Sequence, residues 1–494
     1  MSKRWSVLVV GAIAVAASAH VGSPNVIFDG EAGPYPVRVV VRPPMVVPGR
    51  AEVTVQLRSG ADSTVKHVII RPVFWRAGVA GAPVGDEAAP VPTARATYSG
   101  QLWLMAYGAY SVYVTVQGTR GAGTAVVPVM SFATGRLGFS PGLAILLACL
   151  ALVLVAAMLT LVYAAVAESQ LAPGEPLTPA RRRRARTATA VALPVIALIL
   201  FGGAKWWQSV DAEYQRTLYS TPTPTVKVQT SGGQNVLDIS TLDPSHPLSA
   251  LIPDHGKIMH LFLISRDGAS TFAHLHPTQL DTTNFRLTLP PLPAGAYRLF
   301  ADITTENATT LTLTSALTLP AGAPRAAPGD SDDAWATSVA VSEIAPNAEA
   351  TLGDGFSLAW TGATDSLRAG ETTDLRFTVR DARGPVASLE PYLGMAAHAV
   401  VMRSDASVFI HLHPMGTVSA ATQAVFALRD RGDTTRTGHL PSADVTAAQQ
   451  MAGMPLDGTF DIPYEFPKPG HYRIWVQVKP SGRVLTGTFD AVVH

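Results

Sequence analysis

Two stretches in the second half of the chain decide its fold: MHLFLISRDGASTFAHLHP, from Met259 to Pro277, and AHAVVMRSDASVFIHLHP, from Ala397 to Pro414. Each has one histidine ahead of an apolar run, then a polar turn, then a second run that ends on His-Leu-His-Pro. Apolar and β-branched runs on either side of a short polar turn indicate a β-hairpin. Because the pattern occurs twice, it predicts two domains of the same kind.

The turn of the second copy sets which of its histidines face one another. A two-residue turn at Ser404-Asp405 places His398 opposite His411. Residues i and i+2 of a strand share a face, so His413 lies beside them. We therefore expect three imidazoles on one face of this hairpin.

The first copy has one more residue in its turn. A three-residue loop from Arg266 to Gly268, with glycine in the left-handed position, absorbs it and places His260 opposite His274. His276 then joins them on the same face. A slip of one residue would turn His260 to the other face, so the arrangement depends on the register.

Repeated imidazoles at this spacing predict metal sites, because imidazole is the commonest metal ligand and suits copper, zinc, nickel and iron. The candidate ligands are the six hairpin histidines: His260, His274, His276, His398, His411 and His413. The alternative is a structural strand end, with the rings hydrogen-bonded to the backbone or to a neighbouring sheet.

Methionines favour copper over the other metals. Five of the eleven lie in the second copy: Met395, Met402, Met415, Met451 and Met454. Thioether selects copper(I), while imidazole also holds copper(II). We therefore add Met395 and Met402, which flank His398, to the candidate ligands, and predict copper as the cofactor with zinc as the second choice. Methionine is also a common core filler, which is the alternative role.

Composition bounds the class of protein. The chain has 494 residues, enough for three or four domains. A formal charge of +1 gives no electrostatic signature of a nucleic-acid partner. Apolar residues make up 47% and charged residues 15%, which indicates membrane content. Cys149 is the single cysteine, so disulfides and cysteine-based zinc sites are excluded.

The first residues are typical of a secretory signal peptide spanning 1–19. Lys3 and Arg4 precede an apolar stretch, and Ala17-Ser18-Ala19 is a cleavage pattern; an uncleaved anchor is the alternative. If cleavage follows Ala19, the mature chain begins with His20, whose amine and ring nitrogen can chelate copper. His20 is therefore a further candidate ligand.

Two apolar runs, 140–167 and 188–207, are long enough to cross a bilayer. Between them, residues 168–187 carry an arginine cluster that marks the cytoplasmic side. This predicts a bacterial inner-membrane protein whose N-terminal domain and C-terminal repeats lie on the extracytoplasmic side.

Residues 20–139 contain short apolar alternations separated by turns, which predict an all-β sandwich. Five short motifs carry a family resemblance: Gly33-Pro34-Tyr35-Pro36-Val37, Val47-Pro48-Gly49, Tyr98-Ser99-Gly100, Leu102-Trp103 and Gly108-Ala109-Tyr110. In these motifs the segment resembles the YtkA-like family, related to the exported domain of FixH proteins. The resemblance implies an immunoglobulin-like domain tethered to the membrane and linked to metal handling or oxidase assembly, and it supplies no catalytic residue.

The repeats are expected at 225–320 and 352–494, joined by a linker at 321–351. Each has enough short strands for a sandwich. With their hairpins and the approach Phe466 to Tyr472, they resemble an uncharacterised exported bacterial domain similar to segments of copper-handling membrane proteins. The predicted fold class is mainly β: three immunoglobulin-like β-sandwich domains, two transmembrane helices and a signal peptide.

These features predict a membrane-anchored envelope protein that binds a transition metal for resistance, delivery or metalloenzyme assembly. Its expected partners are the membrane and a metalloenzyme or metal-transport protein, with no nucleic acid. A metal-free adhesion or scaffold protein is the alternative. We expect no enzyme, because the sequence has no nucleophile elbow, H-E-x-x-H motif, phosphate loop or paired-carboxylate signature.

Overall fold

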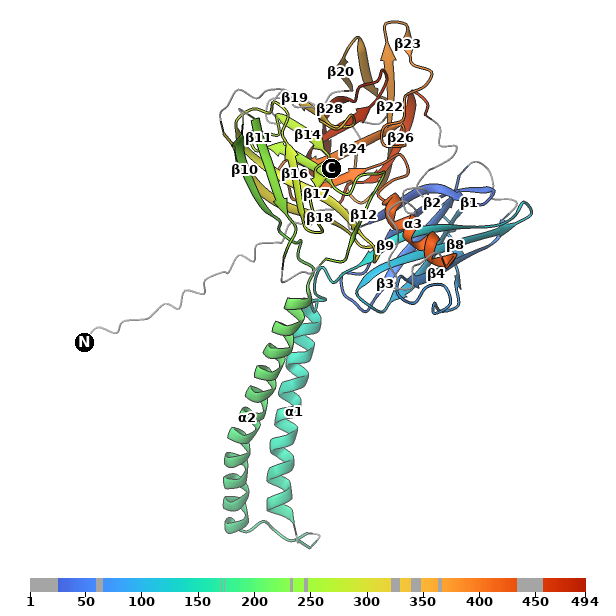
Figure 1. Cartoon of the computed structure of the whole chain (residues 1–494). Coiled ribbons are helices and arrows are strands. Elements are labelled where there is room, and N and C mark those ends of the chain that lie inside the picture. The colour runs from blue at the N-terminus through green and yellow to red at the C-terminus, as the bar shows by residue number, and fades with distance from the viewer. Residues whose placement is uncertain are drawn as a thin grey trace. The chain divides into compact units, whose positions relative to one another are not determined.

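The computed structural model describes residues 25–494 except 59–64, 170, 173, 232–233, 244–247, 321–328, 339–347, 363–366 and 433–455. The expected signal peptide, the candidate ligand His20, and Met451 and Met454 lie outside the described residues. The fold is mainly β, with six antiparallel sheets, as predicted. It divides into two compact units, one of residues up to 131 and from 220 onward, the other of residues 132–219 (Figure 1).

The first domain is a sandwich of nine strands, drawn in blue and cyan in Figure 1. They are β1 (Val26–Ala32), β2 (Tyr35–Arg42), β3 (Gly49–Leu57), β4 (Val65–Phe74), β5 (Asp86–Glu87), β6 (Ala89–Pro90), β7 (Thr97–Leu104), β8 (Gly108–Gly118) and β9 (Gly121–Ser131). One sheet has the order β1-β2-β3-β7-β6 and the other β5-β4-β8-β9. Valines alternate along the strands, so one face of each sheet meets the shared core, as at Val53, Val55, Val112 and Val114.

The second unit is a hairpin of two helices, α1 (Pro141–Glu168) and α2 (Pro179–Thr217). Both are long and apolar enough to cross a membrane and are candidate membrane spans. The arginine cluster expected in a loop belongs to the first turns of α2. Thr178 caps that helix and Pro179 occupies its first turn, and arginine and alanine are good helix formers.

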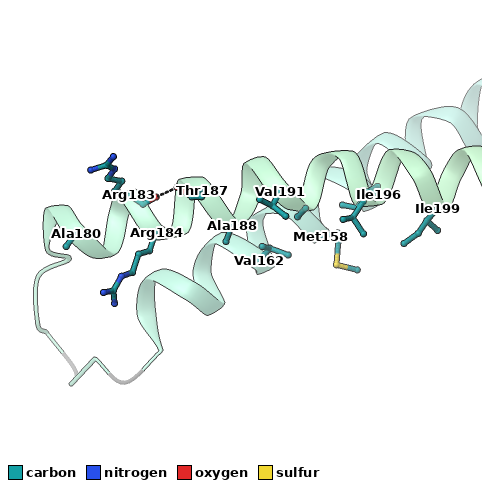
Figure 2. A pocket seen from close by; sticks show the side chains of 12 residues that line it. Met158, Val162, Ala180, Arg183, Arg184, Thr187, Ala188, Val191, Ile196 and Ile199 are labelled. Carbon is teal, nitrogen blue, oxygen red and sulfur yellow. Dashed lines mark hydrogen bonds between the residues drawn. The ribbon is translucent and has the colours of Figure 1, made fainter.

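Side chains of α1 and α2 line a shallow groove, shown in Figure 2. Met158 and Val162 contribute from α1, and Val191, Ile196 and Ile199 from α2. At one end the lining changes from apolar to basic, with Arg183 and Arg184. The apolar side chains along both helices are largely exposed, as expected for surfaces that face lipid.

Repeat 1 is a two-sheet sandwich. Its strands are β10 (Thr225–Ser231), β11 (Gln234–Ser240), β12 (Leu251–Ile252), β13 (His260–Ser265), β14 (Thr271–Leu275), β15 (Thr278–Gln279), β16 (Asn284–Thr288), β17 (Gly295–Thr305), β18 (Thr310–Leu319) and β19 (Ala334–Thr337). One sheet has the order β10-β11-β16-β15; the other is β12-β17-β13-β14-β19, with β18 also on β17. Strand β19 comes from the segment expected to be a linker, so part of that segment completes repeat 1.

Repeat 2 has the same plan. Its elements are β20 (Glu349–Gly353), β21 (Phe356–Trp360), β22 (Thr372–Asp381), β23 (Gly384–Pro385), β24 (Ala397–Arg403), β25 (Phe409–Leu412), α3 (Ala420–Asp430), β26 (Thr459–Glu465), β27 (Gly470–Val478) and β28 (Leu485–Val493). One sheet has the order β20-β21-β22-β23 with β26 on β22, and the other β25-β24-β27-β28. Helix α3 follows the second His-Leu-His-Pro motif.

The two repeats meet through the outer faces of their hairpin sheets. Phe300 of β17 stacks on Phe409 of β25, with ring centres 3.9 Å apart. Phe272 of β14 stacks on Trp475 of β27 at 4.8 Å. Phe300 and Trp475 hold equivalent positions in the repeats, as do Phe272 and Phe409. The contacts are therefore reciprocal, as at the interface of a two-fold dimer.

The first domain docks on repeat 2 through strand β1. The backbone N–H of Asp29 donates to the carbonyl of Met415 at 3.0 Å, and the N–H of Thr417 donates to the carbonyl of Ile27 at 2.9 Å. Nearby, Arg38 of β2 pairs with Asp29 and with Asp374 of repeat 2. The segment that follows His413-Pro414 is thus held by backbone hydrogen bonds from another domain.

Candidate metal centre

The first hairpin has a longer turn than predicted. Leu261 pairs with Leu275 and Phe262 with His274, so His260 is not opposite His274. Extending this register by one residue places His260 opposite His276. The predicted three-residue loop is wrong because Asp267 stabilises a wider turn, in which its carboxylate accepts a hydrogen bond from the Ser270 hydroxyl at 2.7 Å.

The second hairpin departs in the same way. Val400, not His398, pairs with His411, and the same register places His398 opposite His413. The predicted two-residue turn is replaced by a four-residue one, in which the Asp405 carboxylate accepts from the Ser407 backbone N–H at 2.9 Å. In both repeats the register moves by two residues, which leaves every side chain on its predicted face.

His260, His274 and His276 form the first cluster, here called site A. Their ligand atoms lie within 4.8 Å of one another. All three side chains are buried, with 2%, 0% and 6% of their surface exposed. The three histidines of the first copy therefore lie together, as the hairpin pattern predicts, and their role as metal ligands stays a prediction.

Each histidine of site A donates one ring N–H to an oxygen. His260 Nε2 lies 3.1 Å from the carbonyl oxygen of Asp254. His274 Nδ1 lies 2.8 Å from Oε1 of Gln477. His276 Nδ1 lies 2.9 Å from a carboxylate oxygen of Asp333. Such acceptors behind the ring are the usual outer partners of metal-bound histidine.

These hydrogen bonds fix the tautomers and leave the other ring nitrogen of each histidine with a lone pair. His260 Nδ1 and His274 Nε2 then face each other at 3.1 Å without a proton to share. His276 Nε2 is buried and has no hydrogen-bond partner among the described residues. Converging lone pairs repel one another, and a cation between them removes that cost.

Site B consists of His398 and His413 of repeat 2 with His255 of repeat 1, and their ligand atoms also lie within 4.8 Å of one another. The predicted trio of the second copy also lies together, with the ring centres of His398, His411 and His413 between 4.6 and 5.3 Å apart, and His255 adds a ligand that the sequence reasoning missed. Both ring nitrogens of His398 are buried without a hydrogen-bond partner in the described part of the chain.

His411 lies between the two sites. Its ring centre is 5.3 Å from that of His260 in site A and 4.6 Å from that of His413 in site B. Its Nδ1 faces Oδ2 of Asp302 in repeat 1 at 3.4 Å. Its Nε2 is buried and has no hydrogen-bond partner among the residues described.

Burial keeps five of these histidines neutral. Loss of solvent lowers the pKa values of four rings well below their usual range: those of His260, His274, His398 and His411. It lowers the pKa of His413 to about 3. The same effect raises the pKa of Asp302 to about 7, although a hydrogen bond from Thr312 opposes it. Neutral imidazole is the form that binds metal.

A repeated turn motif in the sequence could have indicated His255. Pro253-Asp254-His255-Gly256 and Pro391-Tyr392-Leu393-Gly394 precede the hairpins at equal distances. Both form the same turn, with φ near +50° at the third residue and +80° at the glycine. The second residue of each turn, Asp254 or Tyr392, contacts site A: the Asp254 carbonyl meets His260, and the Tyr392 hydroxyl lies 3.0 Å from His274 Nδ1.

Met395 and Met402, the two methionines predicted as ligands, both pack in hydrophobic clusters. Met395 is buried in the cluster that contains the core of the first domain, next to Met415. Met402 packs among the interface aromatics, including Phe409 and Trp475. This packing fits the alternative role of core fillers, and their role as copper ligands stays a prediction.

Comparison with known proteins gives no function for this chain. No curated protein matches the chain. Three solved structures are similar: a tetra-tandem repeat from the extending region of a large adhesion protein (10% identity, 90% of this chain and 71% of that chain, TM-score 0.17), the FN1–FN3 domains of chicken CNTN1 (7%, 92% and 97%, TM-score 0.14) and an alpha-2-macroglobulin of E. coli (8%, 96% and 23%, TM-score 0.19). Scores this low carry no argument.

A family model, described as a domain of unknown function (DUF8832), matches residues 214–318 and 350–494. The two segments cover repeat 1 up to β18 and nearly all of repeat 2, leave out β19, and make up half of the chain. The match does not reach residues 20–139, whose resemblance to the YtkA-like family stays a prediction. The histidines of both sites fall inside the matched segments. Because the match makes up half of the chain, the chain belongs to the DUF8832 family.

Proposed function

We propose that this protein binds transition-metal ions at site A and site B, and that it does so as a membrane-anchored protein of the bacterial envelope. One observation carries the proposal. Asp254, Gln477 and Asp333 each hold one ring nitrogen of a buried histidine, and the ligand atoms of these three histidines lie within 4.8 Å of one another. A purely structural cluster would satisfy its ring nitrogens with donors, because buried polar groups without a partner are costly.

Copper is the first ion to test and zinc the second. The donors are imidazole nitrogens, and nitrogen sites bind divalent ions most tightly at copper, with zinc weaker. Carboxylate, amide and carbonyl oxygens hold the rings in place, an arrangement that raises affinity for either ion. The buried position suits storage or delivery better than catalysis, since a closed site gives a substrate no access.

The helix hairpin supplies the anchor. The arginines at the start of α2 favour the cytoplasmic side, which puts the first domain and both repeats outside the cytoplasm. There the protein would buffer copper, hand it to a metalloenzyme or transporter, or assist metalloenzyme assembly. Its partners would be the membrane and that acceptor protein.

Metal analysis of the untagged full chain in detergent tests the proposal. We expect copper or zinc to bind at one or two ions per chain after dialysis, and His274→Gln to lower the content by disabling site A. His471→Ala is the matched control, because His471 is an exposed histidine of β27 outside both sites. A wild-type chain that retains neither ion would favour the metal-free scaffold instead.

A further inference from the structure

The two sites share their residues across the interface between the repeats. We propose that site A and site B, linked by His411, form one two-ion centre that clamps repeat 1 to repeat 2. This inference rests on the proposed function, since it assumes that the histidines bind metal. It adds that the ions hold the two repeats together and that the docked interface in turn sets the affinity for the ions.

Site B contains ligands from both repeats. His255 belongs to the turn before β13 of repeat 1, whereas His398 and His413 belong to the hairpin of repeat 2. The ring of His255 lies 5.7 Å from that of His398 and 5.1 Å from that of His413, centre to centre. Imidazoles that share one tetrahedral ion have ring centres roughly 5 Å apart, given metal–nitrogen bonds of about 2.0 Å. An ion in site B therefore bridges the repeats.

Site A depends on repeat 2 through its outer partners. His274 belongs to repeat 1, but its N–H is held by Gln477 and by the hydroxyl of Tyr392, both of repeat 2. That hydroxyl donates to the carbonyl of Asp332 at 3.2 Å, which leaves it free to accept from the ring. Separation of the repeats would remove the contacts that set the His274 tautomer.

His411 completes the reciprocity. His411 is the counterpart of His274. Asp302 is the counterpart of Gln477, because Asp302 pairs with His260 in repeat 1 and Gln477 pairs with His398 in repeat 2. Each middle histidine is thus faced by the equivalent residue of the other repeat. The ring of His411 lies 5.4 Å from His274 in site A and 5.3 Å from His398 in site B, so it links the two sites.

Substitutions in the aromatic stacks test the clamp, because they weaken the contact between the repeats and leave the histidine ligands unchanged. Phe300 and Phe409 hold the repeats together beside the histidines. Because coupling is reciprocal, a change that weakens docking must weaken ion binding. Phe285 gives a matched control: it is equally buried, in β16 of the other sheet of repeat 1, away from the interface.

The experiment is a zinc competition titration of the full chain in detergent, with thermal unfolding in zinc and in chelator. We expect two zinc ions per wild-type chain and a zinc-induced rise in Tm. Phe300→Ala should weaken zinc at least tenfold, while Phe285→Ala lowers Tm with little change in affinity. Phe300→Leu, a milder change, covers the case in which the alanine variant does not fold.

Two ligand variants complete the design. His255→Gln, in repeat 1, should remove one ion and reduce the zinc-induced rise in Tm, and His411→Gln should weaken binding at least tenfold. Two ions bound with wild-type affinity in His255→Gln, His411→Gln and Phe300→Leu would overturn the clamp and leave the proposed function standing. A wild-type chain that binds no zinc or copper would overturn both.

Discussion

One carboxylate oxygen of Asp333 accepts two hydrogen bonds from His276, from its backbone N–H and from ring Nδ1, each 2.9 Å long. The pair is buried and sets both the position and the tautomer of a site A ligand. Asp333→Asn should therefore weaken ion binding at site A about 10- to 100-fold, the usual cost of losing such an outer partner. A copper or zinc competition titration measures it.

The control for this change lies one residue away. Asp332 pairs through its carboxylate with Lys257 and Lys479 and touches no histidine. Asp332→Asn should leave affinity within about twofold of wild type, because its carboxylate pairs with two lysines and holds no ligand of site A. Equal losses in the two variants would mean that general destabilisation, rather than the His276 contact, sets the affinity.

Acid should destabilise the metal-free protein. The buried histidines have lowered pKa values, so in the folded state they stay neutral at pH values where the unfolded chain takes up protons, below about 6.5. Stability is then complete above pH 6.5 and falls towards pH 3, by up to about 1.4 kcal/mol per pH unit for each group. The Tm in chelator, measured from pH 7.5 to 5, should decrease.

Asp302 acts in the opposite sense. Its folded pKa of about 7 lies above the unfolded value, so its contribution is present at low pH and lost as pH rises through 7. One such carboxyl does not outweigh five histidines, so the net trend remains a loss in acid. In Asp302→Asn the fall of Tm from pH 7.5 to pH 5 should become steeper. A Tm that is flat or rises towards pH 5 in the wild-type chain would contradict the assignment of neutral histidines.

Methionine substitutions should spare metal binding. Met402→Leu keeps the volume of a side chain that packs among aromatics, and such swaps usually cost less than about 1.5 kcal/mol. Met395→Leu changes a residue in the cluster shared with the first domain. Both variants should bind copper with wild-type affinity, whereas His276→Gln should not. A tenfold loss of copper affinity in either methionine variant would support a sulfur ligand.

The ion pair at Arg38 should hold the first domain on repeat 2. Its side chain is 7% exposed and pairs with Asp29 and Asp374, so Arg38→Ala removes the partner of Asp29 and leaves Asp374 with Arg58 alone, at 3.6 Å. We expect a loss of about 3 kcal/mol and faster hydrogen exchange at the amides of Asp29 and Thr417, which bridge the domains. Arg50→Ala, at an exposed residue of β3 bonded to Gln101, is the control and should change neither.

Labelling of single cysteines tests the proposed topology. In a Cys149→Ala background, Glu175→Cys places a thiol between the two helices, and Lys66→Cys places one on the first domain. A membrane-impermeant maleimide should label position 66 in intact cells lacking the outer membrane, and position 175 only after lysis. The reverse pattern would place both repeats in the cytoplasm.

The faces of the hairpins could be predicted from the sequence even though the turns could not. Strand alternation puts His260, Phe262 and Ile264 on one side of their strand whatever the turn length. A shift of the register by an even number of residues then keeps His274 of the partner strand on that same face. The turn lengths were missed because Asp267 and Asp405 stabilise wider loops through side-chain hydrogen bonds. An even shift changes which histidines are opposed and leaves the cluster of site A intact.

The amino-acid sequence by itself determined the two repeats, the apolar helices and the six hairpin histidines, because periodicity and hydropathy act over a few neighbouring residues. Only the tertiary structure decided that His255 joins site B, that His411 stands between the sites and that Asp333 comes from the expected linker to hold His276. These residues lie far apart in the chain. They meet because the outer faces of two sheets bury their aromatic side chains against each other, and local patterns carry no record of which faces will pack.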